Sequence, residues 1–404
     1  MSFPAYPQTD RQKQIVTIAQ ELAETFARRA AEYDWAGKFP FENYQDLQTS
    51  GYLALTVPRE YGGWGADVLE VTLAQYYLGQ GCASTALVMG MHLTHIARMG
   101  EGLKNQDPHN EVFERICRAV VEDGAVLNTA VSEPATGSPS RGGRPSTTAR
   151  RQPDGSWLIN GRKTYTTGSS VLKLIPVGCS IVDEADGQLP PLTADRGSFL
   201  VYGDAPGVHI EQTWNSLAMR LSGSNDLILE DVHVEPWAYM DASMPIKPGD
   251  MEAQQRHAAW GLPIAALYLG VAQAARNEAI QFAQRRRPNS LDRSIASVPH
   301  IQEKVAKIEL ALLQSNAVLF GLASQCVVDP SSIPVSQFFA AKYLATNSAI
   351  EITDLAMRVV GGASLAISGS MQRHYRDIRA GLHHPPMDDA TLGLLAKDAL
   401  EIKE

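Results

Sequence analysis

Residues 128–168 read NTAVSEPATGSPSRGGRPSTTARRQPDGSWLINGRKTYTTG, and this stretch decides the fold. It begins with small hydroxyl-bearing residues around Ser132 and continues as a loop rich in glycine, serine and arginine. It closes on Trp157–Lys163, a pattern typical of a strand, a tight turn and a second strand. The sequence therefore predicts that one β unit presents two short segments that carry hydroxyl groups.

The hydroxyl and aromatic residues of these segments suit a planar heteroaromatic ligand. Ser132 and Thr167 can hydrogen-bond the polar edge of such a ring, while Tyr165 packs against its face. An isoalloxazine ring is the leading candidate. The alternative is an ordinary hairpin with a polar loop, and periodicity alone does not separate the two interpretations.

Three motifs, met in order along the chain, add a family resemblance. They are SEPATGS (132–138), WLINGRKTYTT (157–167) and MRLSGSNDLILEDVHVEP (219–236). Together they resemble the mid-chain signatures of the acyl-CoA dehydrogenase superfamily. The resemblance implies an α+β fold with an N-terminal all-helical domain (1–127), a central antiparallel β domain (128–245) and a C-terminal four-helix bundle (246–404). It also implies a flavoprotein with FAD, assembled as a homodimer or homotetramer.

The patterning of the chain agrees with this order of elements. Apolar residues recur at helical spacing in an opening helix after Thr9, and a helix rich in small and apolar residues is expected over about Val68–Met99. Short alternating runs separated by Gly, Pro and Asp turns follow between about Leu127 and Met240. Helical periodicity returns from about Ala253 to the end of the chain.

Composition sets the outer limits on function. The chain has 404 residues, 44% of them hydrophobic, so it can bury a large core in two or three domains. A net charge of −9 argues against nucleic acid as a partner. The four cysteines are widely spaced without metal-ligand spacing, which predicts no metal site and favours a reduced, cytoplasmic location.

Two features of the sequence argue against a membrane protein. The first residues lack the apolar centre of a signal peptide. Residues 258–275 carry no charge and just reach membrane length, but Pro263 and Gln273 favour a buried helix, and no comparable second segment is expected.

The resemblance assigns flavin-binding roles residue by residue. Ser132 matches a residue at the flavin pyrimidine edge, Thr167 a residue near the flavin N5, and Tyr165 stands where the family has a Trp against the ring. Arg286 matches an arginine that pairs with the FAD pyrophosphate across the subunit interface, although it is also an ordinary helix C-terminal arginine. Gly361 and Gly362 match glycines whose backbone lies close to the FAD, an approach that a side chain would block.

Substrate contacts are implied in the same way. Ser138 matches a serine that meets the pantetheine arm of a CoA thioester, although Pro139 replaces the usual Asp. Met91 and His92 fall on a helix that lines the substrate cavity in the family. For both residues core packing is the competing interpretation.

The catalytic base of the common acyl-CoA dehydrogenases is missing. By the resemblance, one position for this glutamate holds Pro385 and the alternative position holds Trp260. The nearby segment LHHPPMDD (382–389) supplies His384, Asp388 and Asp389 as candidate catalytic residues. The spacing from Arg376-Asp377 to His384 resembles the flavin monooxygenase branch of the superfamily, where an imidazole that titrates near neutrality assists catalysis.

Three functions follow from these features. The first is α,β-oxidation of an acyl-CoA, with hydride transfer to FAD and an electron-acceptor flavoprotein as partner; this interpretation ranks narrowly first. The second is a two-component monooxygenase that uses O2 and reduced flavin, FAD or FMN, supplied by a flavin reductase, with His384 assisting. The third is an inactive flavin-binding scaffold.

Overall fold

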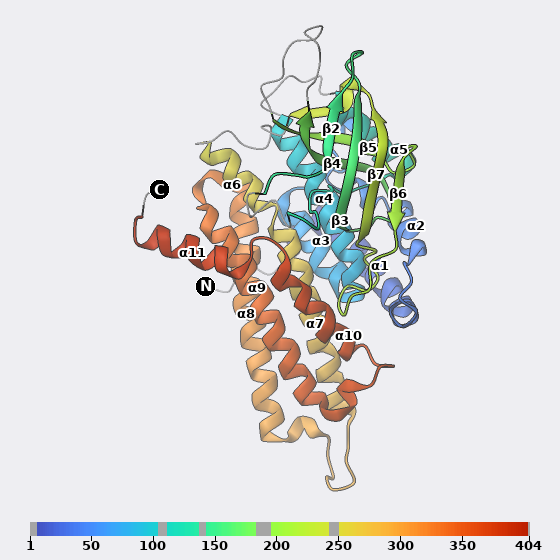
Figure 1. Cartoon of the computed structure of the whole chain (residues 1–404). Helices are drawn as coiled ribbons and strands as arrows, with labels where there is room; N and C mark the ends of the chain where they lie inside the picture. Colours follow the sequence, from blue (N-terminus) through green and yellow to red (C-terminus); the bar gives the residue numbers. More distant parts are fainter. Residues whose placement is uncertain (1–5, 104–110, 137–142, 183–194, 242–249, 403–404) are drawn as a thin grey trace.

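The computed structural model describes residues 6–103, 111–136, 143–182, 195–241 and 250–402. Ser138 therefore lies outside the described residues. Helices open the chain, strands occupy its middle and helices close it, so the fold is the expected α+β arrangement with a helical N-terminal part, a central sheet and a C-terminal helical bundle (Figure 1).

The N-terminal part consists of helices that wrap around α3 and α4. Its elements are α1 (Asp10–Ala36), α2 (Phe41–Thr49), η1 (Tyr52–Ala54), η2 (Arg59–Tyr61), α3 (Val68–Gly81), α4 (Ala83–Leu103) and α5 (Glu111–Asp123). The opening helix begins at a capping box in which Thr9 accepts from the backbone of Gln12, and it ends at Gly37. The single helix expected over Val68–Met99 is two helices, because Cys82 has extended backbone angles that interrupt it.

The middle part is one twisted sheet. Its strands are β1 (Val126–Leu127), β2 (Thr148–Arg151), β3 (Trp157–Thr166), β4 (Leu172–Val182), β5 (Arg196–Tyr202), β6 (Val208–Glu211), β7 (Asn225–Val234) and β8 (Tyr239–Asp241). The strand order is β6-β7-β3-β2-β4-β5-β8, with β1 beside β4. Most pairs are antiparallel as expected, but β4 pairs with β1 and with β2 in parallel.

The tight turn expected within Trp157–Lys163 is wrong. These residues belong to the single ten-residue strand β3, and the hairpin turn lies earlier, between β2 and β3. Asn160 instead bonds Asp231 on the neighbouring strand β7, where the pairing register shifts. Gly161 has φ +154, and a Cβ there would lie 2.5 Å from Thr147 Oγ1, so the glycine marks a bulge in the strand.

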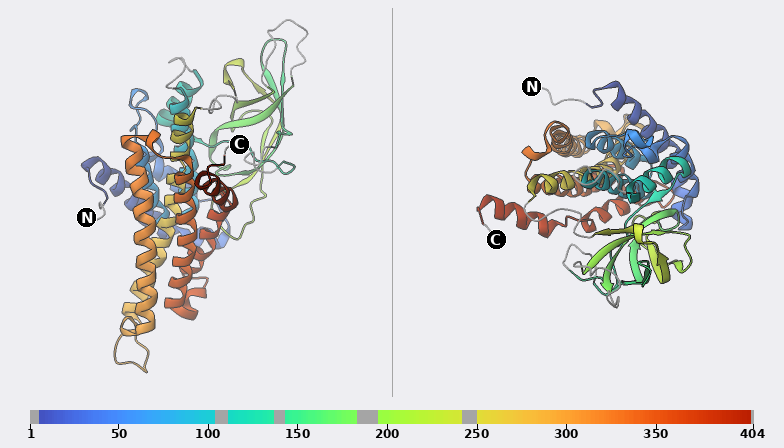
Figure 2. Two further views of the ribbon diagram at one scale, coloured as in Figure 1. Left: turned by 90° about the vertical axis from the view of Figure 1, so that its left-hand side faces the viewer. Right: turned by 90° about the horizontal axis from the view of Figure 1, so that it is seen from above.

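The C-terminal part is a bundle of long helices beside the sheet (Figure 2). Its elements are α6 (Met251–Ala259), α7 (Leu262–Arg285), α8 (Pro299–Val328), α9 (Val335–Val360), η7 (Gly361–Leu365), α10 (Met371–Asp377), η8 (Ile378–His383) and α11 (Asp388–Ala399). Helix α7 is the central one, because it packs against α3, α4, α8 and α9.

Two stretches, not one, are long and apolar enough to cross a membrane. They are Met251–Arg285 and α8, and the second corrects the expectation of a single such segment. The most apolar part of the first is 72% buried within the protein, whereas that of α8 is only 28% buried. The first is thus a core helix, and α8 presents an apolar surface.

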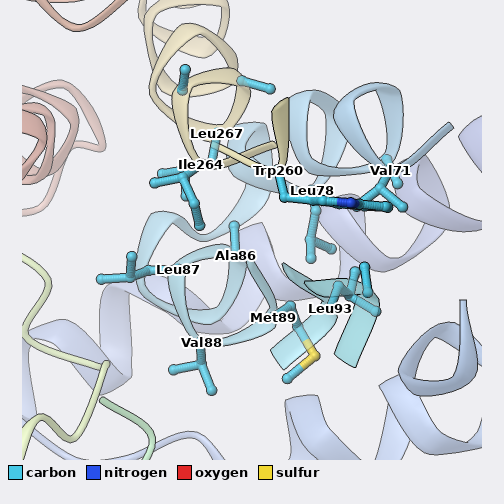
Figure 3. Close-up of a cluster of buried hydrophobic side chains, with 14 of the residues drawn as sticks. Val71, Leu78, Ala86, Leu87, Val88, Met89, Leu93, Trp260, Ile264 and Leu267 are labelled. Atoms are coloured by element: carbon cyan, nitrogen blue, oxygen red, sulfur yellow. The ribbon is translucent and has the colours of Figure 1, made fainter. Parts of the chain in front are cut away.

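The core runs continuously from the N-terminal helices into the bundle. Figure 3 shows its central cluster, in which Trp260 lies beside Val71 and Leu78, while Met89 and Leu93 approach from α4. Packing at this junction fixes α4 relative to α7, and it thereby sets the positions of the residues that these helices present to the sheet.

Candidate active site

A buried ion pair joins the first two sequence motifs. The Lys163 side chain on β3 is fully buried and places Nζ 2.6 Å from Glu133 Oε1 and 2.6 Å from the carbonyl of Gly178. Burial opposes ionisation of Glu133, but hydrogen bonds from Lys163, Ser146 and Thr147 outweigh it and lower its pKa to about 2. The pair therefore clamps the Ser132 loop onto β3, and Thr164 N–H also donates to Ser132 O at 2.9 Å.

Polar contacts run from this loop to the third motif. Asn128 accepts from the backbone of Thr129 at 2.8 Å and donates to Thr167 O at 2.9 Å. The Thr167 hydroxyl lies 3.0 Å from that of Ser224, which lies 2.8 Å from that of Ser222. All three motifs thus meet around Thr167, as the resemblance implies.

Tyr165 is the exposed aromatic residue of the site. Its side chain is 67% exposed, its φ is +54, and its ring meets that of Trp214 edge-on at 6.3 Å between centroids. A positive φ is uncommon for a residue with a side chain, and it turns the ring out of the strand. The open ring of Tyr165, the hydroxyl of Thr167 two residues on and the Ser132 backbone bonded to Thr164 fit a planar ring with a polar edge, so these residues suit a flavin.

The Arg376-Asp377 pair anchors the C-terminal segment to the third motif. Asp377 Oδ1 accepts from the backbone N–H of Met219 at 2.7 Å, and burial raises its pKa to about 6. Arg376 donates to Asp34 on α1 and to Leu217 O at 2.8 Å. Both side chains are therefore occupied by structural contacts that carry the chain from α10 towards His384.

His384 forms a short hydrogen bond with Tyr268 of α7. The distance from His384 Nδ1 to the Tyr268 hydroxyl is 2.6 Å. Burial and the positive charge of Lys342 lower the pKa of His384 to about 4, so its imidazole is neutral at pH 7. Burial also raises the pKa of Tyr268 well above 10, so the phenol keeps its proton.

The contact with Tyr268 occupies one ring nitrogen of His384. Tyr268 makes no other hydrogen bond to the described part of the chain, and either its hydroxyl or a protonated Nδ1 can be the donor. Nε2 is the nitrogen left for a ligand, as an N–H donor in one tautomer and as an acceptor in the other.

Lys342, close to His384, and Asp388, close to Lys342, are the charged residues next to this histidine. Lys342 on α9 is 3% exposed, and its Nζ has no hydrogen-bond partner among the described residues; burial lowers its pKa. Asp388 Oδ2 accepts from Asn347 at 3.0 Å, whereas its buried Oδ1 has no partner in the described structure. Asp389, in the first turn of α11, is exposed. His383, at the end of η8, is also exposed.

The two positions of the missing base stay without a carboxylate. Pro385 follows His384 on the surface, and Trp260 is 5% exposed within the apolar cluster of Figure 3. Neither residue can accept a proton at neutral pH. Two carboxylates act on this cluster: the charge of Asp388 acts on Lys342, and that of Asp377 acts on Tyr268.

His92 does not face a substrate, which corrects its assignment from the sequence. It is fully buried, its Nδ1 accepts from Leu127 N–H at 3.0 Å and its Nε2 lies 2.9 Å from Leu53 O. Both ring nitrogens are therefore used to tie η1 and β1 to α4. Met91 is half-buried and packs against the core.

Arg286, Gly361 and Gly362 lie at the ends of two bundle helices. Arg286 caps the end of α7 and Gly361 that of α9, and all three residues are exposed. These helix ends lie at the end of the bundle away from the sheet (Figure 1). Gly361 has φ +70, which favours glycine, and nothing lies within 4 Å of a Cβ built on either glycine. One chain therefore does not bring these residues together with Thr167.

Sequence reasoning missed several residues of the site. Tyr268, Asn128 and Lys342 carry hydrogen bonds or charge at the centre, yet each stands in an apolar or featureless stretch. The signal that could have found Lys342 is its isolated charge on the otherwise apolar face of α9. No group of three or more His, Cys, Asp or Glu side chains in the described ranges is arranged to hold a metal ion.

Comparison with known proteins gives the same order of domains. Three family models match: the N-terminal domain of acyl-CoA dehydrogenase over residues 9–103, its middle domain over 128–232 and its C-terminal domain over 261–382. The putative acyl-CoA dehydrogenase YdbM of Bacillus subtilis (strain 168) is 42% identical over 98% of each chain.

More distant relatives include proteins named for other reactions. The amino sugar nitrososynthase RubN8 of Streptomyces rubradiris is 28% identical over 93% of this chain and 86% of its own. The structure of KijD3 in complex with FMN and dTDP-3-amino-2,3,6-trideoxy-4-keto-3-methyl-D-glucose superimposes with a TM-score of 0.84, at 26% identity, over 98% of this chain and 96% of the other. The three matched domains and the full-length relative show that the chain belongs to the acyl-CoA dehydrogenase family of flavoproteins.

Proposed function

We propose that this protein is a flavin-dependent monooxygenase built on the acyl-CoA dehydrogenase fold. The observation that carries the proposal is the His384–Tyr268 hydrogen bond, next to Pro385, which stands at a position where the resemblance places the dehydrogenase base. A dehydrogenase must remove an α-proton, which requires a proton acceptor with a pKa near the working pH. The pKa of His384 is about 4, well below that range, and donation from the Tyr268 hydroxyl to Nδ1 would leave a proton on Nε2.

An N–H donor suits oxygen chemistry. When bound, a reduced flavin would supply the electrons that activate O2, so that one oxygen atom enters the substrate and the other leaves as water. His384 Nε2–H can stabilise negative charge that develops on an oxygen atom, and Tyr268 holds the imidazole in the tautomer that does so. The exposed Tyr165 and the hydroxyl of Thr167 would orient the flavin ring.

The names of two relatives support this choice. RubN8 is named an amino sugar nitrososynthase, and KijD3 is in complex with FMN and a dTDP-linked amino sugar, which is not an acyl thioester. A reductase would supply the reduced flavin here. We propose FAD or FMN as that flavin, bound by Ser132, Tyr165 and Thr167. Arg286, Gly361 and Gly362 would reach the flavin of a second copy, since they lie away from Thr167.

A homodimer or homotetramer supplies that second copy. Exposed apolar side chains gather on α8, where Leu310 is 66% exposed, Leu313 55% and Val328 85%. A helix that is apolar on most sides yet largely exposed is expected to be covered in the assembled protein. We place the subunit interface on this face of the bundle.

Oxidation of an acyl thioester is the second candidate. One observation favours it: Asp388 Oδ1 is buried without a hydrogen-bond partner among the described residues, so a carboxylate oxygen is open near His384. The name of the 42% identical relative points the same way. In this case Asp388 would act as the base.

Anaerobic mixing separates the two candidates. The purified oxidised flavoprotein is mixed with a panel of saturated acyl-CoA esters in the absence of O2. The visible absorbance of the oxidised flavin, which is lost on reduction, is followed by stopped flow. The monooxygenase predicts no bleaching by any thioester. Bleaching that persists in His384→Ala but is lost in Asp388→Asn would overturn the proposal and establish the dehydrogenase.

A further inference from the structure

A polar face of α4 lies beside the candidate flavin site and has no role in the proposed chemistry so far. Thr94, His95 and Arg98 share this face, because residues three and four apart on a helix are neighbours. His95 Nε2 lies 3.1 Å from Thr129 Oγ1, and Arg98 Nε donates to His257 O at the end of α6 at 3.2 Å. Two helices and the Ser132 loop thus converge on one cluster.

The cluster has an unused hydrogen-bond donor. Thr94 is 3% exposed, and its hydroxyl makes no hydrogen bond in the described structure, although a helical Thr commonly bonds the carbonyl one turn earlier. Leaving such a donor unpaired in the interior is costly unless a ligand or water satisfies it.

Arg98 is the positively charged group of the cluster, and the Glu101 carboxylate one turn along α4 opposes its charge. Arg98 carries a full positive charge, and burial lowers its pKa to about 10, so it stays protonated at pH 7. Burial and the charge of Arg98 lower the pKa of both His95 and His257 to about 3, which leaves their imidazoles as neutral donors or acceptors. The further titratable groups that face them are His92, which is fully bonded, and Glu101, which acts on Arg98 from one turn away.

The cluster is reachable and close to the flavin edge. His95, Arg98 and His257 are half-buried, so part of each side chain meets solvent. Thr129, the partner of His95, is held by Asn128, which also holds the carbonyl of Thr167. These hydrogen bonds connect the cluster to the backbone of Thr167 through Thr129 and Asn128.

We propose that Thr94, His95, Arg98 and His257 form a binding site for an oxyanion group of the substrate, a carboxylate or a sulfonate. Arg98 supplies the charge, His95 and His257 supply neutral donors, and Thr94 supplies a buried hydroxyl. The assignment rests on the proposed function in that the ligand is the molecule to be oxygenated, and it names that molecule as a small organic acid.

Binding is measured by calorimetry on the flavin-loaded protein, without turnover. The probes are benzoate, butyrate and benzenesulfonate, each paired with its neutral amide, in a buffer without chloride. The expected result is that at least one acid binds and its amide does not. Arg98→Gln should weaken that binding by roughly tenfold or more, as for the loss of a charge-assisted hydrogen bond.

Matched variants guard against a misfolded protein. Arg98→Lys keeps the charge and should retain most of the affinity, whereas Arg118→Gln removes an exposed arginine of α5 and should change nothing. Thr94→Val, which deletes only the unpaired hydroxyl, should weaken binding without lowering the melting temperature.

Two results overturn the site. One is that no acid binds the unaltered protein more tightly than its amide; the other is that Arg98→Gln binds the acids as well as the unaltered protein does. Oxygen-dependent turnover that is unchanged in Arg98→Gln would refute the oxyanion site but not the monooxygenase. Selective binding of acids by a protein whose flavin is bleached by acyl-CoA would support the oxyanion site but refute the monooxygenase.

Discussion

At the scale of single residues, the tautomer of His384 decides between the candidate reactions. The sequence places an imidazole near the missing glutamate, but an imidazole can act as an acid or as a base. The contact with Tyr268, a residue 116 positions earlier in the chain, shows that Nδ1 is the occupied nitrogen. Donation by the Tyr268 hydroxyl would make Nε2 a donor, and this is the state that the proposed chemistry uses.

Removal of His384 should be the most damaging change in the site. His384→Ala is expected to lower turnover by about 10²–10⁴-fold, the usual contribution of a group that handles a proton in the transition state. Tyr268→Phe loses one hydrogen bond and frees Nδ1, so a smaller loss of roughly two- to tenfold in kcat is expected. The exposed neighbour His383 supplies the control. Steady-state rates of His383→Ala as low as those of His384→Ala would contradict this assignment.

Arg286 separates the two possible flavins. If it pairs with the pyrophosphate of a flavin held by a second copy, Arg286→Ala should weaken retention of FAD more than that of FMN, since only FAD carries the distal phosphate and adenosine. The adjacent exposed Arg285→Ala is the matched control. Flavin retained after gel filtration is measured for each variant, and equal losses of FAD and FMN would refute the interface role of Arg286.

At the scale of elements, residues of the three motifs make contacts between segments. Glu133 of the first motif pairs with Lys163 of the second, and Thr167 of the second meets Ser224 of the third. These pairs hold the Ser132 loop, β3 and the loop before β7 in one constellation. The site is therefore preorganised by the sheet rather than by the loops that carry it.

Breaking the buried ion pair should destabilise the β unit as a whole. Lys163→Met leaves the Glu133 carboxylate buried without its cation, at an expected cost of about 3–5 kcal/mol in the free energy of unfolding. Adding Glu133→Gln should recover part of that loss. Lys173→Met removes an exposed lysine of β4 and serves as the control. Urea denaturation that shows Lys163→Met within about 0.5 kcal/mol of the control would contradict the clamp.

The sequence was informative where a pattern is local, and it was uninformative where a contact is distant. Helical and strand periodicity predicted the succession of elements, and the motifs predicted that Ser132, Tyr165 and Thr167 lie together. Asn160-Gly161 has the residues of a turn, yet Asn160 bonds Asp231 on β7, and the strand β3 continues through a bulge at Gly161. The roles of His92 and Tyr268 depend on their hydrogen-bond partners, Leu53 and His384, which are distant in the sequence. No local pattern predicts such partners.

At the scale of the whole molecule, the helices divide between a buried core and an exposed face. Helix α7 is buried from Leu262 to Ala272, whereas α8 exposes apolar residues along its length. The cluster around His384 lies between α7, α9 and the C-terminal segment, and the flavin-edge residues lie on the sheet. The function of the chain thus depends on how the sheet and the bundle are held together.

Five histidines, two of them buried and three half-buried, should make the fold sensitive to acid. Burial lowers the pKa of His92 and His384 to about 4 and that of His95, His257 and His374 to about 3, from an ordinary value of 6.5. Between pH 6.5 and about 4 the unfolded chain therefore binds more protons than the folded one, and stability falls as pH falls. The slope approaches about 1.4 kcal/mol per pH unit for each histidine that stays neutral.

Denaturation curves between pH 7.5 and 4.5 measure this effect. Asp377 acts in the opposite sense, because its raised pKa of about 6 favours the folded state as it takes up a proton, and it offsets part of the slope. A single Asp cannot cancel five histidines. An unfolding free energy that is constant or rises on acidification from pH 6.5 to 4.5 would show that these imidazoles are not held neutral.

Isotope labelling gives the most direct test of the monooxygenase. The protein is supplied with a flavin reductase, NADH, flavin and ¹⁸O2, together with a panel of small organic acids, and the products are analysed by mass spectrometry. The account predicts a product that gains one ¹⁸O atom, whose yield falls by about 10²-fold or more in His384→Ala but not in His383→Ala. Formation of an α,β-unsaturated acyl-CoA without ¹⁸O, under air or under argon with an electron acceptor, would contradict it.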